Sequence, residues 1–167
     1  RIVMVSIGEG NAIAQGLNTP ATWTDERGNA VATIEVLGIE EEWQDYGEFE
    51  EPSRGTSYLA MQVSVTNISD DIVTVAPYSF SLVDSESANT MTAWVSGNDT
   101  VAEELLTVDV VLEPGDSLVG TIVFAVYSGV APTALLWQPE WGTLSIVVVA
   151  DGAAPDGGAT PVASPAS

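Results

Sequence analysis

The sequence contains no cysteine, histidine or lysine, and its only basic residues are Arg1, Arg27 and Arg54. Without Cys and His, the chain has no disulfide, no conventional zinc site, no haem or iron–sulfur ligands, and no Ser-His-Asp or Cys-His catalytic set. Without Lys, it forms no Schiff base and carries no P-loop lysine. These absences exclude the commonest metal centres and most of the familiar catalytic mechanisms.

Positive charge is scarce overall, since 24 acidic residues against three basic ones give a net charge of −21. Nucleic acid is a poor partner for such a chain, because binding relies on cationic side chains that neutralise phosphates. Anionic membrane surfaces are disfavoured by the same repulsion. The acidity fits either adaptation to high salt, which screens self-repulsion, or an acidic secreted protein kept soluble by its charge.

Long apolar runs are also missing. A membrane-spanning helix needs about 18 apolar residues, and the longest runs here, 118–127 and 144–150, have the length of strands. We therefore expect no transmembrane segment. The chain begins at Arg1 rather than Met, which fits a mature form without its signal peptide. The lack of Cys suits a secreted bacterial protein, and it also suits a reduced cytoplasm.

What the sequence does contain is repeated alternation of apolar and polar residues. Leu, Met, Val and Val occupy the odd positions from 59 to 65, with polar residues between them, which is typical of a half-buried strand. Similar alternation recurs in segments 31–39, 78–82, 106–112, 118–126, 135–137 and 144–148. Helix signals are nearly absent. The pattern predicts an all-β protein, an immunoglobulin-like antiparallel β-sandwich of about 7–9 strands.

The alternation also predicts a core and one connection. Both faces of 118–127 are apolar, so we expect this strand to be central in its sheet and covered on both sides. Glu113-Pro114-Gly115-Asp116 carries the Pro-Gly pair of a type II turn and is expected to join two neighbouring antiparallel strands. The predicted core residues are Leu59, Met61, Val63, Val65, Phe80, Leu82, Val108, Val110, Ile122, Phe124 and Val126.

The two ends of the chain differ from this pattern. Residues 150–167 are rich in Ala, Gly, Pro, Ser, Thr and Asp, a composition that predicts a flexible tail or linker after a sandwich that comprises residues 1–149. Near the N-terminus, 2–7 and 21–25 are candidate short strands.

Three segments in order carry a resemblance to a known family: 58–71 (YLAMQVSVTNISDD), 80–84 (FSLVD) and 112–126 (LEPGDSLVGTIVFAV). They resemble the bacterial extracellular immunoglobulin-like modules classed as a domain of unknown function, related to a secreted actinobacterial immunoprotective antigen. The resemblance covers residues 30–149, although Ser85-Glu86-Ser87 stands where the family usually has a Gly. It implies a secreted or surface-attached β-sandwich, often part of a lipoprotein, without established catalytic or binding residues.

Residues 40–51 (EEEWQDYGEFEE), called the acidic loop below, hold seven carboxylates. Calcium takes several carboxylate and carbonyl oxygens from flexible loops, so Glu41, Glu42, Asp45 and Glu48 are candidate Ca²⁺ ligands. The alternative is a solvated acidic loop on an acidic protein, and no EF-hand spacing is present. Apart from this candidate Ca²⁺ ion, we expect no cofactor.

The same loop holds Trp43, Tyr46 and Phe49, one aromatic at every third position. These are candidate ligand-binding residues, because aromatic rings offer a large contact area to a sugar or a partner peptide. The alternative is that the rings fold back and cap an open end of the sandwich.

The leading functional hypothesis is a non-enzymatic secreted or cell-surface module for adhesion, assembly or ligand binding, with a protein or a glycan as its partner. The alternative hypothesis is a calcium- or carbohydrate-binding accessory domain that uses the acidic loop. A hydrolase that relies on carboxylates alone is a third class. Because chance pairs are inevitable among 24 acids, we expect no enzymatic activity and no catalytic residues.

Overall fold

In the computed structural model, the described residues are 12–14, 16–25, 27–86, 89–101, 104–139 and 144–147. Within them the chain forms eleven strands and one short 3₁₀ helix, η1 (Pro77–Ser79). The strands make two large sheets and one small sheet. The predicted all-β sandwich is confirmed. The candidate strand 2–7 and the predicted tail 150–167 lie outside the described residues.

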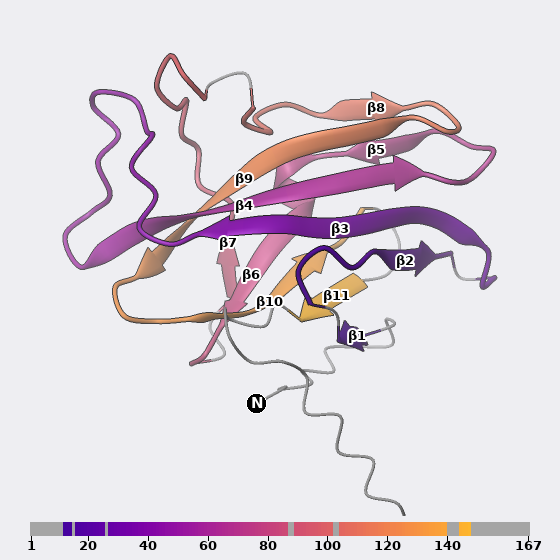
Figure 1. The fold of residues 1–167 in the computed structure, drawn as a ribbon, viewed down its shortest axis with the longest axis horizontal. Coiled ribbons are helices and arrows are strands. Elements are labelled where there is room, and N and C mark those ends of the chain that lie inside the picture. Colours follow the sequence, from indigo (N-terminus) through magenta and orange to yellow (C-terminus); the bar gives the residue numbers. More distant parts are fainter. Residues whose placement is uncertain are drawn as a thin grey trace, which may run out of the picture.

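The first large sheet has four antiparallel strands in the order β2-β3-β4-β9. Its members are β2 (Ala21–Thr24), β3 (Ala30–Glu40), β4 (Thr56–Asn67) and β9 (Ser117–Tyr127). Three of these are long, and they lie side by side across the molecule in Figure 1. Their length follows from the sustained period-two alternation of the sequence, which keeps one face apolar along each strand.

The second large sheet has five strands in the order β1-β11-β10-β6-β7, of which β1 and β11 are parallel and the other neighbours antiparallel. Its members are β1 (Ala12–Ala14), β11 (Leu144–Val147), β10 (Pro132–Trp137), β6 (Phe80–Asp84) and β7 (Asn89–Met91). In the view of Figure 1 these strands run at an angle to those of the four-stranded sheet.

Between the two sheets lies a single apolar cluster, the inner core. The four-stranded sheet contributes Ile34, Met61 and Phe124, and the five-stranded sheet contributes Phe80 and Trp137, all fully buried. The Trp137 ring stacks on Phe80 with ring centroids 6.0 Å apart. Nearly all of the predicted core residues belong to this cluster, and Val110 packs against it while partly buried.

The prediction was wrong for Val108, which is 67% exposed. The strand expected over 106–112 is reduced to β8 (Val110–Leu112), which pairs with β5 (Val73–Val75) in the small sheet. Leu106 still donates its N–H to the carbonyl of Thr121 on β9. The chain therefore leaves β9 after Leu106 and crosses to β5. Val108 lies on this crossing, outside any sheet, so the alternation of apolar and polar residues does not place its side chain in the core.

The Pro114-Gly115 turn has the predicted type II form, with Gly115 at φ +88° and Asp116 N–H donating to the Glu113 carbonyl at 3.0 Å. The strands on either side of it are not neighbours, however, since β8 pairs with β5 and β9 pairs with β4. The end of β4 separates them.

Asn67, the last residue of β4, lies between β8 and β9 beside the Pro114-Gly115 turn and is fully buried. Its main-chain N–H donates to the Asp116 carbonyl and its carbonyl accepts from Gly115 N–H. Its side-chain amide donates to the carbonyls of Asp71 and Leu112, and its Oδ1 accepts from the N–H and hydroxyl of Ser69. Asn67 thus connects the end of β4 both to the turn that follows it and to the Pro114-Gly115 turn. All donors and acceptors of its side-chain amide are used.

Candidate ligand-binding cavity

The outer face of the four-stranded sheet is covered where β4 and β9 meet. Ala60 and Val123 point away from the inner core, yet they are only 5% and 4% exposed. Two irregular segments cover them, the acidic loop between β3 and β4 and the segment 93–106 between β7 and β8, of which residues 93–101 and 104–106 are described. The prediction that β9 is covered on both faces holds only around Thr121 and Val123, since Val119 and Tyr127 on the outer face are 56% and 67% exposed. The prediction that β9 is central was wrong, because it is the last strand of its sheet.

The buried residues of this covering form a second apolar cluster, called the outer cluster: Trp43, Ala60, Val95, Leu105 and Val123. The segment 93–106 is fixed by main-chain hydrogen bonds to β9. Ala93 donates to the Val123 carbonyl at 2.7 Å, and Thr121 donates to the Glu104 carbonyl at 2.8 Å.

The acidic loop turns sharply as soon as β3 ends. Glu42 has φ +55°, a left-handed conformation that is uncommon outside glycine. Its carbonyl accepts the side-chain amide of Gln44 at 2.8 Å. Directly after the turn, the Trp43 N–H donates to the Tyr58 carbonyl on β4 at 2.8 Å. This bond holds Trp43 over the sheet.

The predicted aromatic trio is only partly brought together. Trp43 is 3% exposed and Phe49 is 92% exposed, whereas Tyr46 is half-buried. The third ring beside Trp43 and Tyr46 is Tyr58 of β4, and the three rings meet edge to face, with centroids 5.5–6.3 Å apart. Trp43 and Tyr46 thus fold back onto the protein, as in the alternative interpretation of the sequence. They cover the outer face of the four-stranded sheet, however, and not an open end of the sandwich. Burial, followed by the charge of Glu50, raises the pKa of Tyr58 above its ordinary value.

Two acidic side chains join the acidic loop to the segment 93–106. Glu50 accepts the N–H and the hydroxyl of Ser96 at 2.8 and 2.7 Å and the Gly47 N–H at 3.2 Å. These hydrogen bonds, that of the Ser96 hydroxyl first, hold the pKa of Glu50 below its ordinary value. Asp45 accepts the Asn98 side-chain amide at 2.9 Å, and its carbonyl accepts the Asn98 N–H at 2.7 Å.

The four candidate calcium ligands do not converge. Glu41 and Glu42 line a cavity of about 270 Å³ above Leu59 and Val126, at the end of the sandwich. Asp45 lines a different cavity, and Glu48 is exposed. Among the described residues, no three acidic side chains come close enough together to hold a metal ion.

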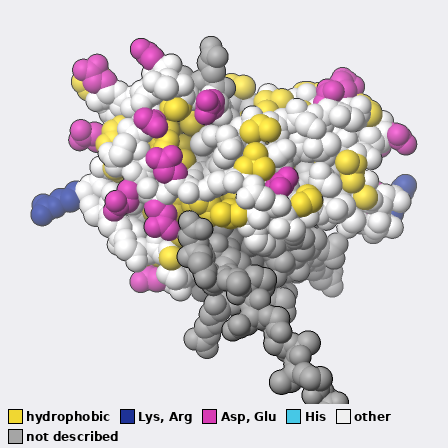
Figure 2. All heavy atoms as spheres, in the orientation of Figure 1, with side chains coloured by type: hydrophobic (Ala, Val, Ile, Leu, Met, Phe, Trp, Pro, Cys, Tyr) yellow, Lys and Arg dark blue, Asp and Glu magenta, His cyan; other side chains and the backbone are white. Residues whose placement is uncertain are grey.

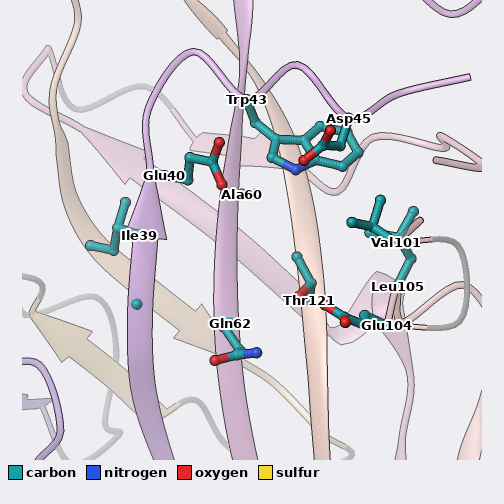
Figure 3. A pocket seen from close by; sticks show the side chains of 11 residues that line it. Ile39, Glu40, Trp43, Asp45, Ala60, Gln62, Val101, Glu104, Leu105 and Thr121 are labelled. Carbon is teal, nitrogen blue, oxygen red and sulfur yellow. The ribbon is translucent and has the colours of Figure 1, made fainter. Parts of the chain in front are cut away.

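The cavity that Asp45 lines has a volume of about 290 Å³ and lies on the outer face of β3, β4 and β9. Figure 3 shows Gln62 and Thr121 on its floor, Trp43 and Asp45 at one end, and Glu104 with Leu105 at the side. Three carboxylates, one amide, one hydroxyl and one indole edge surround it, together with apolar walls. Its remaining lining residues are Gly38, Ile39, Glu40, Ala60 and Val101.

Sequence reasoning missed most of this site. Gln62 and Thr121 do alternate with core residues, which places them on outward faces, but only the strand register sets them directly opposite each other. Glu104 and Leu105 reach the cavity because Leu105 forms a bridge with Thr121. Nothing in the local pattern of residues 104 and 105 indicates that bridge.

The surface around the cavity is acidic. Figure 2 shows acidic side chains over much of one face, most densely at the end that carries the acidic loop. In the part of the chain that the structure describes, no helix is long and apolar enough to cross a membrane.

The fold assigns the chain to the antiparallel β-sandwich proteins. More specifically, it belongs to the DUF4352 family, whose model is described as a domain of unknown function and matches residues 27–144. This agrees with the class of domain that the three sequence segments resemble. The further relation to the actinobacterial antigen stays a prediction. No curated protein sequence matches the chain.

Two crystal structures of Bacillus subtilis proteins share the fold. A "putative lipoprotein" (ycdA) of strain 168 is 18% identical, with a TM-score of 0.58 over 77% of this chain and 38% of its own. This chain thus spans well under half of that relative. The yjhA protein is 13% identical, with a TM-score of 0.56 over 80% of this chain and 98% of its own. At such identities the likeness shows the fold alone.

Proposed function

We propose that this protein is a non-enzymatic extracellular module that binds a ligand in the cavity beside Trp43, in the service of adhesion or assembly at the cell surface. The observation that carries the proposal is that cavity of about 290 Å³, in which polar groups converge on apolar walls. Binding sites typically combine a concave apolar lining with a few placed polar groups.

Composition supports binding over catalysis. The chain has no His, Cys or Lys, so it lacks the usual general base and the usual activated nucleophiles. The family is one of unknown function, and its description names no reaction. We infer that the carboxylates around the cavity recognise a ligand rather than transform one.

Two likenesses support an extracellular location. Three segments of the sequence resemble secreted immunoglobulin-like modules, and one structural relative carries the lipoprotein designation. Antibody detection of the protein in surface and culture fractions of its native cells tests the location, and confinement to the cytoplasm would contradict it.

The binding role is tested by NMR, with isotope-labelled protein titrated with separate pools of sugars, amines, carboxylic acids and short peptides. We expect one pool to shift amide signals of the cavity lining, and the bound compound to be recovered unchanged. Gly38 lines the cavity, and a Cβ there meets no heavy atom within 4 Å. Gly38→Leu should therefore obstruct binding without a clash at its Cβ, whereas the matched control Gly16→Leu, which also has an open Cβ position, lies away from the cavity and should not. Chemical conversion of the ligand, or shifts only outside the cavity, would contradict the proposal.

A further inference from the structure

Two aromatic side chains on the covering segments take no part in the packing of the protein. Phe49 is 92% exposed and Trp94 is 78% exposed, the two highest values among the large hydrophobic side chains of the described residues. Phe49 belongs to the acidic loop and Trp94 to the segment 93–106. Aromatic side chains are enriched where proteins bind one another, so the question is whether the two rings form one surface.

Phe49 lies at the tip of a closed turn. The Glu50 N–H donates to the Gly47 carbonyl at 3.0 Å, and the Glu50 carboxylate accepts the Gly47 N–H at 3.2 Å. The turn rests on the other covering segment, because the same carboxylate accepts the N–H and the hydroxyl of Ser96. A Cβ on Gly47 would lie 3.3 Å from the Ser96 Oγ. Phe49 is therefore held beside the segment 93–106.

Trp94 is directed outward by its neighbours in the chain. Ala93 donates its N–H to a carbonyl of β9 at 2.7 Å, and Ala93 and Val95 both pack in or against the outer cluster. Trp94 and Ser96 are exposed and alternate with these positions, so their side chains share the outward face of the segment. Trp94 thus lies on the face against which the turn of Phe49 rests.

These contacts make Phe49 and Trp94 neighbours on one surface, called the aromatic patch. The contact of Glu50 with Ser96 keeps the Cα atoms of the two aromatic residues within about 20 Å of each other. An extended peptide advances about 3.3 Å per residue, so a segment of about six residues reaches both rings. Single exposed apolar residues are common, whereas neighbouring ones rimmed by polar residues mark interaction sites. Both rings also project from hydrogen-bonded backbone, which lowers the entropy lost on binding.

The surroundings of the aromatic patch are strongly acidic. The acidic loop holds seven carboxylates and the segment 93–106 three more, and neither contains a basic residue. Glu48 and Glu51, next to the turn of Phe49, are exposed. The nearest basic residue along the chain is Arg54. Figure 2 shows acidic side chains most densely at this end of the molecule. Such a surface attracts a cationic partner, whereas a second copy of the chain, with its own net charge of −21, is repelled.

We propose that the aromatic patch binds a segment of another protein that carries arginine or lysine side chains. The cationic groups pack on the rings of Phe49 and Trp94, and carboxylates such as Glu48 and Glu51 accept their hydrogen bonds. A neutral glycan would leave these carboxylates unused, and nucleic acid would be repelled. Neither ring lines the cavity beside Trp43, so this surface is distinct from the proposed ligand-binding site.

The test titrates the intact chain with a hexapeptide of alternating arginine and glycine, blocked at both ends, in about 0.15 M salt. The readout is the Trp94 indole N–H signal by NMR, assigned through its loss in Trp94→Ser. A matched hexapeptide carries glutamine in place of arginine. We expect a saturable shift with the arginine peptide and none with the glutamine peptide. No shift with the arginine peptide, or equal shifts with both, would overturn the inference.

Uncharged substitutions separate the aromatic patch from the general attraction of an acidic protein for a cation. Trp94→Ser and Phe49→Ser keep the net charge, and each should weaken binding about twofold to fivefold by calorimetry, as expected for one exposed cation–π contact. The matched control Ile72→Ser removes an exposed side chain beside Asp70 and Asp71, past the opposite end of β4, and should leave the affinity unchanged. Unchanged affinity in both aromatic variants would mean that charge alone holds the peptide, and would overturn the inference.

Two further measurements distinguish this surface from the alternatives. Gly38→Leu, which obstructs the cavity beside Trp43, should leave binding of the arginine peptide intact. Loss of binding in that variant would place the peptide in the cavity, which would overturn this inference while supporting the proposed function. Sedimentation of the protein alone should show no self-association. Self-association that Trp94→Ser abolishes would make the aromatic patch an interface between copies of the chain, and would also overturn the inference.

Discussion

The β4–β9 pair has buried apolar side chains on both faces, along its whole inner face but only around Ala60 and Val123 on its outer face. The two faces are covered in different ways. The inner core lies between two hydrogen-bonded sheets and contains the largest fully buried side chains, among them Phe124 and Trp137. The outer cluster lies under two irregular segments that polar contacts join, chiefly those of Glu50 with Ser96 and Asp45 with Asn98. The packing of the two sheets leaves the inner core closely filled, whereas the loops over the outer face leave a cavity of about 290 Å³ beside the outer cluster.

The largest effect is expected in the inner core. Phe124 is 0% exposed, and Phe124→Ala removes a whole ring between sheets that cannot collapse onto the void. The expected loss is about 3–5 kcal/mol in the free energy of unfolding, measured by urea denaturation. Val119→Ala on the same strand, where the side chain is 56% exposed, should change that energy by less than about 0.5 kcal/mol. Similar losses for both variants would contradict the assignment of the core.

A smaller and more local effect is expected in the outer cluster. Trp43→Ala should cost about 3 kcal/mol or less, at or below the lower limit for large aromatic side chains, because the loops can partly close the gap. Hydrogen exchange should become faster in the acidic loop and in residues 93–101, while β3 and β4 keep their protection. If Trp43→Ala lowers protection throughout the inner core as Phe124→Ala does, the two clusters are one cooperative unit.

The same contrast explains how far the sequence could predict the molecule. Strands such as β4 were predictable because a buried face repeats every second residue. The type II turn was predictable because its third position requires positive φ, which glycine adopts without strain, and Gly115 stands there at φ +88°. The failure at Val108 arose where the chain changes sheets, an event that alternation does not record.

The cavity could not be predicted from the sequence, because its lining residues come together only through tertiary contacts. Glu104 and Leu105 meet Thr121 only through the fold of an irregular segment. The acidic loop was recognised as the place to look, but its carboxylates separate because the turn at Glu42 directs Glu41 and Glu42 to one cavity while Asp45 lines the other. Residue spacing within a loop carries no such information.

Glu50 provides a test of the contacts that hold the covering loops together. Its hydrogen bonds from Ser96 and Gly47 stabilise the ionised form, so its pKa in the folded state lies below the ordinary 4.5. The stability that they contribute is present above that value and is lost as pH falls through the folded pKa. Glu50→Gln should therefore lower the melting temperature slightly at neutral pH and flatten its decline below pH 4.5, by thermal melts across pH. Glu48→Gln, in the same loop but exposed, is the matched control, and an equal flattening there would assign the effect to net charge.

The smallest difference is expected between calcium and sodium. The net charge of −21 predicts that any salt stabilises the fold by screening repulsion, most of all near the acidic loop. A specific Ca²⁺ site would add a further gain, about 2.7 kcal/mol at a hundredfold excess over Kd. Glu41 and Glu42 line one cavity and Asp45 another, however, so these ligands do not surround a common point. We therefore expect equal melting shifts in CaCl₂ and in NaCl of matched ionic strength. A larger shift in calcium that disappears in the triple variant Glu41→Gln, Glu42→Gln, Asp45→Asn would instead establish the site, and would mean that the acidic loop rearranges around the ion.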